Sequence, residues 1–166
     1  MKKLEEIIDL HQCPLTDVDF IDKCRNNLDK NGVLVLPTFL NHKAIEALVI
    51  DAEENQHKAF YSNSTHNVYL TKSDPQLDKN HIFNRQIISS KGCITTDQIS
   101  KSSLLKTIYN SEDFKFFISN VLKEERLYEY VDSVSSINVH FANSGQELGW
   151  HFDNSSLLLP FCFKPH

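Results

Sequence analysis

The sequence of 166 residues lacks several features that would each indicate a class of protein. Its longest apolar stretches, such as residues 33–36 and 157–159, are much shorter than the roughly 18 residues that a membrane-spanning helix needs. The amino terminus carries Glu5, Glu6 and Asp9 where a secretory signal would have an uninterrupted apolar segment. We therefore expect a cytoplasmic protein with no membrane span and no export signal.

Positive charge and paired cysteines are also scarce. The chain has 17 Lys and Arg against 22 Asp and Glu, which gives a net charge of -5, and its basic residues are scattered. Because proteins that bind nucleic acids usually cluster positive charge, we expect no nucleic-acid partner. The four cysteines lie far apart and form no CxxC pair, so the sequence indicates buried free thiols rather than a zinc knuckle or a redox motif.

The composition that remains is that of an ordinary globular domain. Hydrophobic residues make up 40% of the chain and charged residues 23%. A folded chain of this length buries roughly 70% of its unfolded surface, so a core can form without disulfides. No repeat, low-complexity tract or linker interrupts the sequence, and we predict one domain over residues 1–166.

Helical periodicity dominates the first 127 residues. We predict helices where apolar residues recur at helical spacing, with Thr16 and Asn41 as N-caps of the second and third: residues 1–10, 16–32, 41–60 and two within 103–127. Residues 33–39 indicate a short strand, and residues 61–103 indicate loops with one or two short strands. The side chains expected in the core are Ile45, Leu48, Val49, Phe117 and Val121.

An alternating pattern over residues 134–141 predicts a strand with one polar face, on which Asn138 and His140 lie. After a turn, extended structure is expected again over residues 148–154, which contain His151 and Asp153 in an H-x-D pattern. The two-residue period of a strand places these two side chains on the same face. An imidazole and a carboxylate are two of the three ligands of the 2-His-1-carboxylate set that holds Fe(II). The alternative is a surface histidine with an aspartate in a nearby turn.

The run from Ser135 to Phe141, the turn after it, and the run LGWHFDNSS from Leu148 to Ser156 resemble the first two core strands of an Fe(II)/2-oxoglutarate-dependent dioxygenase. The upstream segments are similar to the branch of small bacterial proteins related to amino-acid hydroxylases and halogenases and, more distantly, to phytanoyl-CoA hydroxylase. The resemblance covers nearly the whole chain to Ser156. It implies an α+β fold with an incomplete double-stranded β-helix, a jelly-roll of cupin-like form, and N-terminal helices packed on one sheet.

The resemblance also implies a non-haem oxygenase that uses Fe(II) and 2-oxoglutarate to hydroxylate a small molecule. His151 and Asp153 would be catalytic and would bind the iron. The related halogenases have a small residue in place of this carboxylate, so Asp153 favours hydroxylation. Asn138 and His140 are candidates for contact with 2-oxoglutarate, with a solvated strand face as the alternative.

Two further residues are candidates for substrate contact. Arg85 lies in the long loop region where such enzymes hold substrate, although a surface arginine is the simpler interpretation. Trp150 lies next to His151, although packing inside the barrel is the simpler interpretation.

The resemblance ends before the family's pattern is complete. Members of the family supply a distal histidine and a basic residue for 2-oxoglutarate after the H-x-D motif, whereas 13 residues follow Asp153 here. We therefore expect a truncated chain that binds Fe(II) weakly and turns over 2-oxoglutarate poorly or not at all. The alternatives are a catalytically inactive remnant that binds a partner or self-associates through a carboxyl-terminal strand at residues 157–163, and a cupin-like metal protein with His140 as a donor.

Overall fold

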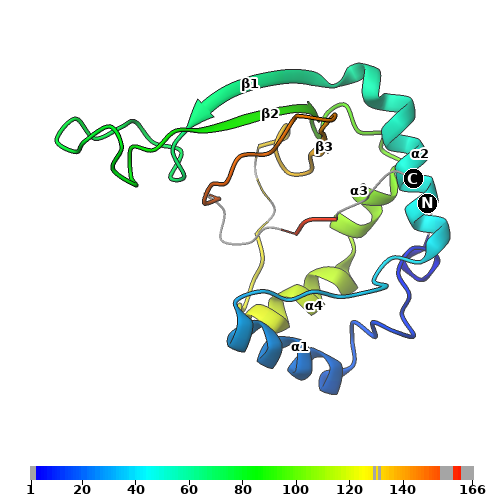
Figure 1. Ribbon diagram of the computed structural model, residues 1–166. Coiled ribbons are helices and arrows are strands. Elements are labelled where there is room, and N and C mark those ends of the chain that lie inside the picture. The colour runs from blue at the N-terminus through cyan, green and yellow to red at the C-terminus, as the bar shows by residue number, and fades with distance from the viewer. Residues whose placement is uncertain (1–2, 129, 131, 154–158, 162–166) are drawn as a thin grey trace. The chain divides into compact units, whose positions relative to one another are not determined.

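The computed structural model describes residues 3–128, 130, 132–153 and 159–161. In this part the chain is α+β, with four α-helices, two 3-10 helices and a three-stranded antiparallel sheet (Figure 1). Contacts divide it into two compact units: unit 1 comprises Met1–Glu54 and Thr96–Ile137, and unit 2 comprises Asn55–Thr95 and Asn138–His166. None of the helices in the described ranges is both long enough and apolar enough to cross a membrane.

Unit 1 contains the helices, except for the last residue of α2 and the short η2. Their bounds are η1 Leu4–Glu6, α1 Val18–Asn31, α2 His42–Asn55, α3 Leu104–Tyr109 and α4 Glu112–Leu122. The N-cap of α1 is Asp17 rather than the expected Thr16, because the Asp17 carboxylate accepts a hydrogen bond of 2.8 Å from the Phe20 amide. Gly32 ends the helix at a φ of 69°, which a glycine adopts without strain. Asn41 caps α2 as predicted, since its side-chain oxygen accepts from the Ala44 amide at 2.9 Å.

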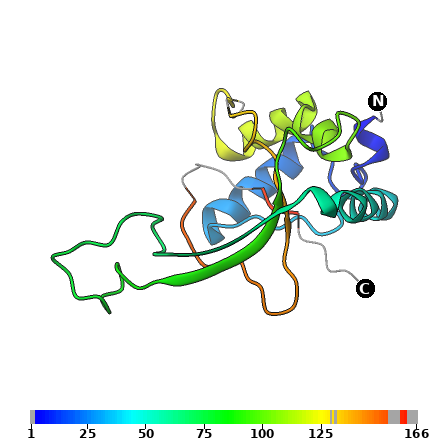
Figure 2. The same cartoon turned by 90° about the horizontal axis from the view of Figure 1, so that it is seen from above.

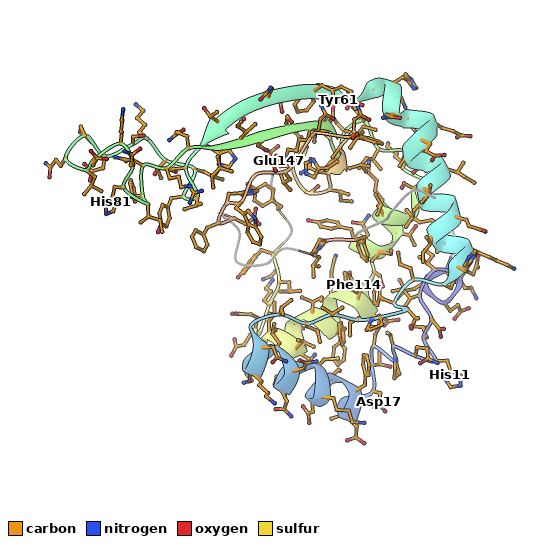
Figure 3. The ribbon with its side chains drawn as sticks, viewed as in Figure 1. His11, Asp17, Tyr61, His81, Phe114 and Glu147 are labelled. Atoms are coloured by element: carbon orange, nitrogen blue, oxygen red, sulfur yellow. The ribbon has the colours of Figure 1, made fainter. Side chains whose placement is uncertain are left out.

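The core of unit 1 consists mainly of aliphatic side chains, with three buried phenylalanines among them. Phe117 on α4 is fully buried and stacks on Phe20 of α1 with ring centroids 5.8 Å apart. Phe114, labelled in Figure 3, packs against Phe39 at 5.7 Å. The expected burial of Leu48, Phe117 and Val121 is confirmed, whereas Val49 is half-buried. The expectation for Ile45 is wrong: α2 buries the face that carries Ala44 and Leu48, and Ile45 lies just beside it.

Two predicted elements near the amino terminus are not formed. Residues 33–39 form no strand; Val33 and Val35 are exposed, whereas Phe39 is buried, so only part of this apolar pattern corresponds to burial. Residues 1–10 were expected to be helical, but the described part holds only the single 3-10 turn η1. The reason is pairing with a distant segment: the Asp9 amide donates to the Phe39 carbonyl, and the Asn41 amide donates to the Ile7 carbonyl, each at 3.0 Å.

Unit 2 contains the sheet, with β1 (Phe60–His66), β2 (Ile87–Ile94) and β3 (Val139–Phe141) in the order β1-β2-β3. η2 (Gln56–Lys58) precedes β1. Figure 2 shows β1 and β2 side by side as one long, curved hairpin. The two longest strands therefore lie in the region that was expected to be mostly loop. β3 is shorter than the expected strand over residues 134–141, since residues 134–137 instead hydrogen-bond to Thr96 within unit 1.

The loop that joins β1 to β2 is organised by two buried asparagines. Asn84 is 5% exposed; its side-chain oxygen accepts from the Asp74 amide at 2.7 Å, and its amide group donates to the Asp74 carbonyl at 2.8 Å. Asn67, fully buried, accepts from the amides of Tyr69 and Thr71. This long loop therefore has a defined internal framework.

Candidate metal centre

One face of the sheet in unit 2 carries most of its side chains that could bind a metal or a charged ligand. Residues paired across antiparallel strands share a face, and side chains two apart along a strand do so too. The register pairs Cys93 with His140 and His66 with Ile87, so His66, Lys91, Cys93 and His140 lie on the same face. Asn138 lies there as well, because its side-chain oxygen is 3.8 Å from the Cys93 sulfur. The expected shared face of Asn138 and His140 is thus present.

The segment that carries the H-x-D motif lies along β2 and the end of β1. The Ser90 amide donates to the Glu147 carbonyl at 2.8 Å, and Figure 3 labels Glu147 beside β2. At the other end, the Phe152 amide donates to the Val68 carbonyl at 2.7 Å. Residues 148–153 have no strand assignment, so the predicted strand is absent and these two contacts position the segment instead.

Gly149 lies where the segment touches the hairpin most closely. A Cβ atom at this position would lie 2.5 Å from the Ile88 carbonyl oxygen, which is backbone and cannot easily move. It would also lie 3.2 Å from Nε2 of His66. A side chain at this position would therefore push the H-x-D segment away from the sheet.

His151 and Asp153 lie on the same side of this segment. Nε2 of His151 is 3.6 Å from Oδ1 of Asp153, and the two side chains are 20% and 38% exposed. Nδ1 of His151 is 2.7 Å from the Gly149 carbonyl oxygen. Because a carbonyl oxygen only accepts, Nδ1 is the donor, and Nε2 of the neutral ring carries the lone pair. Metal-binding histidines in proteins are typically held in this way.

His66 also lies at this site, although no motif in the sequence marks it. Its ring meets the His151 ring edge to face, with centroids 5.7 Å apart and an interplanar angle of 85°. Nδ1 of His66 is 3.0 Å from the Asn67 carbonyl oxygen, so the same argument leaves Nε2 with the lone pair. The signal could not be read from the sequence, because 85 positions separate His66 from His151 and only strand pairing brings them together.

His140 contributes a further imidazole on this face. Loss of hydration is the largest of the effects that lower the pKa of His140, even though part of the residue is exposed at the surface. The charges of Lys91 and His151 lower this pKa further. A hydrogen bond to the Gly92 backbone acts in the opposite direction. The net effect favours the neutral ring, which is the form that can bind a metal or accept a hydrogen bond.

The two candidates for substrate contact lie in different settings. Arg85 is exposed on the β1–β2 loop and lines a surface hollow with Lys79, Asn80 and Gln86. Trp150 is 84% exposed, so packing does not explain it in this structure. The contacts of both residues with a substrate stay predictions.

Three aromatic rings form a stack beside the H-x-D motif. Tyr69 lies between Phe83 and Phe152, with centroid distances of 5.0 Å and 5.4 Å and nearly parallel planes. Phe152 is the middle residue of the motif, and Phe83 belongs to the loop that also carries Arg85. The stack therefore connects that loop to the candidate metal ligands.

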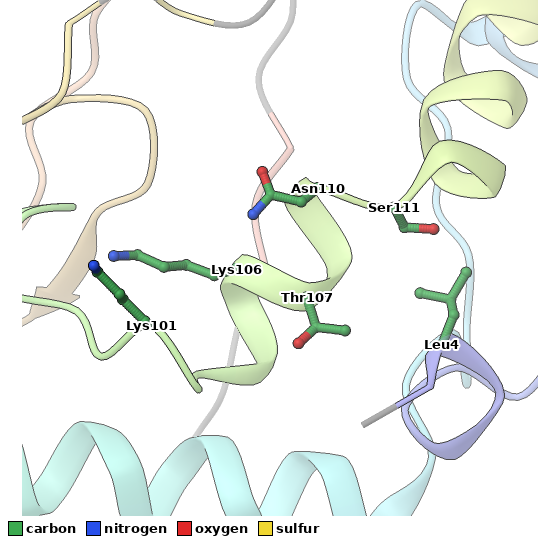
Figure 4. A pocket seen from close by; sticks show the side chains of 6 residues that line it. All are labelled: Leu4, Lys101, Lys106, Thr107, Asn110 and Ser111. Carbon is green, nitrogen blue, oxygen red and sulfur yellow. The ribbon is translucent and has the colours of Figure 1, made fainter. Parts of the chain in front are cut away.

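Unit 1 has a separate surface hollow, shown in Figure 4. Its lining residues are Leu4, Lys101, Lys106, Thr107, Asn110 and Ser111. The Lys106 ammonium donates to the Ile99 carbonyl at 2.7 Å and so takes part in the packing of this unit. The lining contains neither a carboxylate nor an imidazole, so its chemistry differs from that of the candidate metal centre.

Within residues 3–128, 130, 132–153 and 159–161, no three His, Cys, Asp or Glu side chains converge as a ready-made metal site. Most of the strand predicted at residues 157–163 lies outside the described residues, and the described positions 159–161 have no regular structure. In comparisons with known proteins, no family model, no curated protein and no solved structure matches this chain.

Proposed function

We propose that this chain is a non-haem Fe(II)- and 2-oxoglutarate-dependent oxygenase that hydroxylates a small molecule, with His151 and Asp153 as iron ligands. The observation that carries the proposal is the distance of 3.6 Å between Nε2 of His151 and Oδ1 of Asp153. Two donors that share one metal ion at about 2.1 Å each lie about 3.0 to 3.4 Å apart. A small side-chain rotation would bring this pair to ligand distance.

The chemistry of the donors fits iron. An imidazole nitrogen and a carboxylate oxygen suit Fe(II), and the Gly149 carbonyl holds His151 in the tautomer that such a ligand needs. Iron at this position would supply the activation of O2 with 2-oxoglutarate. The residues of this chain would hold it, and Asp153 would keep a carboxylate at the position that the similar halogenases leave open to chloride.

The same face of the sheet offers groups for 2-oxoglutarate. Asn138 and His140 would provide hydrogen bonds from β3 and the residue before it. Lys91 shares the face, and its charge reaches His140. Because a charge-assisted hydrogen bond is about twice as strong as a neutral one, Lys91 is the group we assign to a carboxylate of 2-oxoglutarate.

For the fold, we propose that the antiparallel sheet is the first part of a double-stranded β-helix. Two features support this assignment: the antiparallel order β1-β2-β3, and the pairing of Glu147 with Ser90 after β3. Jelly-roll barrels are built from antiparallel strands that hold ligands in the mouth of the barrel.

The test is succinate formation from 2-oxoglutarate with Fe(II) and ascorbate under air. The full chain is compared with His151→Ala and with His11→Ala, which removes an exposed imidazole in unit 1. We expect slow but measurable succinate formation from the parent and from His11→Ala. We expect His151→Ala to form no more succinate than the parent forms in the presence of an iron chelator. A parent chain that forms no succinate, or a His151→Ala variant that forms as much as the parent, would refute the proposal.

A further inference from the structure

The geometry points to His66 as the third protein ligand of this centre, which would complete a 2-His-1-carboxylate set with His151 and Asp153. The inference rests on the proposed function for the position of the metal, but it concerns binding and not turnover. It adds a donor from β1, which lies far from the H-x-D motif in the sequence.

The first support is the placement of the two imidazoles. Two imidazoles on one metal, with metal–nitrogen bonds of about 2.1 Å, have ring centroids about 5 Å apart. The rings of His66 and His151 are 5.7 Å apart. The position of a Cβ on Gly149 would lie 3.2 Å from Nε2 of His66, so this nitrogen faces the segment that carries the motif.

The second support is the state of each ring. Nδ1 of His66 contacts the Asn67 carbonyl, as Nδ1 of His151 contacts the Gly149 carbonyl. Both rings are therefore held with Nδ1 as the donor and Nε2 as the potential ligand. A backbone carbonyl on the far nitrogen is the typical outer contact of a histidine that binds a metal.

The third support is the rigidity of the surroundings. His66 ends β1 opposite Ile87, and the residue after it, Asn67, is fully buried. The hydrogen bond from the Phe152 amide to the Val68 carbonyl then ties the H-x-D segment to this same corner. Of the three proposed ligands, His66 is therefore the one held on a regular element, where its position is the most precise.

In the described part of the chain, the side chains of His66, His151 and Asp153 do not converge on one point. Metal binding by all three therefore requires side-chain rotation. The His151 and Asp153 side chains are both partly exposed, which leaves room for that movement. His140 is the other imidazole on the face. His66 is favoured over His140 because its ring is in direct edge-to-face contact with the His151 ring.

The experiment is a titration of the full chain with Co(II) as a stand-in for Fe(II), followed by quenching of tryptophan fluorescence. Trp150 is the single tryptophan of the chain and is adjacent to His151. We expect His66→Ala to weaken Co(II) binding at least about tenfold, as loss of a donor should. His66→Phe keeps an aromatic ring against His151 without a donor nitrogen, and we expect the same loss. His11→Ala should bind Co(II) as the parent does.

The outcomes separate this inference from the proposed function. Loss of Co(II) affinity in both His66 variants, with far-UV circular dichroism unchanged, supports the third ligand even if the parent forms no succinate. Parent-like Co(II) affinity in His66→Phe overturns it even if the parent does form succinate. A loss in His140→Ala with none in His66→Phe assigns the third donor to His140 and also overturns it.

Discussion

Replacement of Asn84 by alanine should open the loop between β1 and β2 without unfolding the helices of unit 1. The Asn84 side chain is buried, and it accepts from the Asp74 amide while it donates to three backbone carbonyls. The carbonyl acceptors belong to Asp74, Leu77 and Asp78, at 2.8, 3.1 and 3.2 Å. An amide group has two hydrogens, so these three carbonyls share two donors.

The magnitude follows from this count. Two donated bonds and one accepted bond, each with a net value of about 1 kcal/mol, stabilise the closed loop by about 3 kcal/mol. Since 1.4 kcal/mol is a factor of ten, the opening equilibrium of the loop should shift by about 100-fold in Asn84→Ala. The loss is local, because a loop can open independently of the global unfolding transition.

Amide hydrogen exchange at Asp74 measures this shift directly. We expect exchange up to about 100-fold faster in Asn84→Ala, and an intermediate rate in Asn84→Asp, which keeps the acceptor but not the donors. Asn80→Ala, an exposed change in the same loop, is the matched control and should leave the rate unchanged. Unchanged exchange at Asp74 in Asn84→Ala would refute the assignment of this side chain as the organiser of the loop.

Three other changes test other parts of the structure. Gly149→Ala should weaken Co(II) binding at least about tenfold while circular dichroism is retained, because its Cβ would meet the Ile88 carbonyl at 2.5 Å; parent-like binding would contradict the close approach. Phe117→Ala should lower the free energy of unfolding in urea by about 3 to 5 kcal/mol, whereas the half-exposed neighbour Phe116→Ala should cost much less. Burial raises the pKa of the Cys24 thiol above the ordinary value of 9.0, so the stability that this thiol contributes is complete below pH 9 and is lost as the pH rises through the raised pKa. Urea unfolding of the parent and of Cys24→Ala at pH 7 and pH 10 checks the sign, and an equal pH dependence in both proteins would count against it.

The sequence by itself was sufficient for the helices α1, α2 and α4. Their apolar spacing and their caps at Asn41 and Gly32 depend on contacts within a few turns of one chain segment. Local signals of this kind predict these elements, and their errors lie at the ends: the N-cap of α1 moves from Thr16 to Asp17, and the helix predicted to residue 60 ends at Asn55.

The sequence was misleading where structure depends on a partner strand. Residues 33–39 have the composition of a strand, yet they find no ladder, and Val33 and Val35 remain exposed. The polar residues of β1 have the composition of a loop, yet they form the longest antiparallel pairing in the described part of the chain. Strand formation is decided by non-local hydrogen bonding and packing, so composition is a weak guide to it.

The candidate metal centre was also predictable from the sequence only in part. The spacing of His151 and Asp153 was enough to predict that both side chains lie close together, although the strand on which that prediction depended is not formed. The contribution of His66 depends on the register of β1 against β2 and on the hydrogen bond between the Phe152 amide and the Val68 carbonyl. Only the tertiary structure could decide it, because chain closure over 85 positions leaves no periodic signal in the sequence.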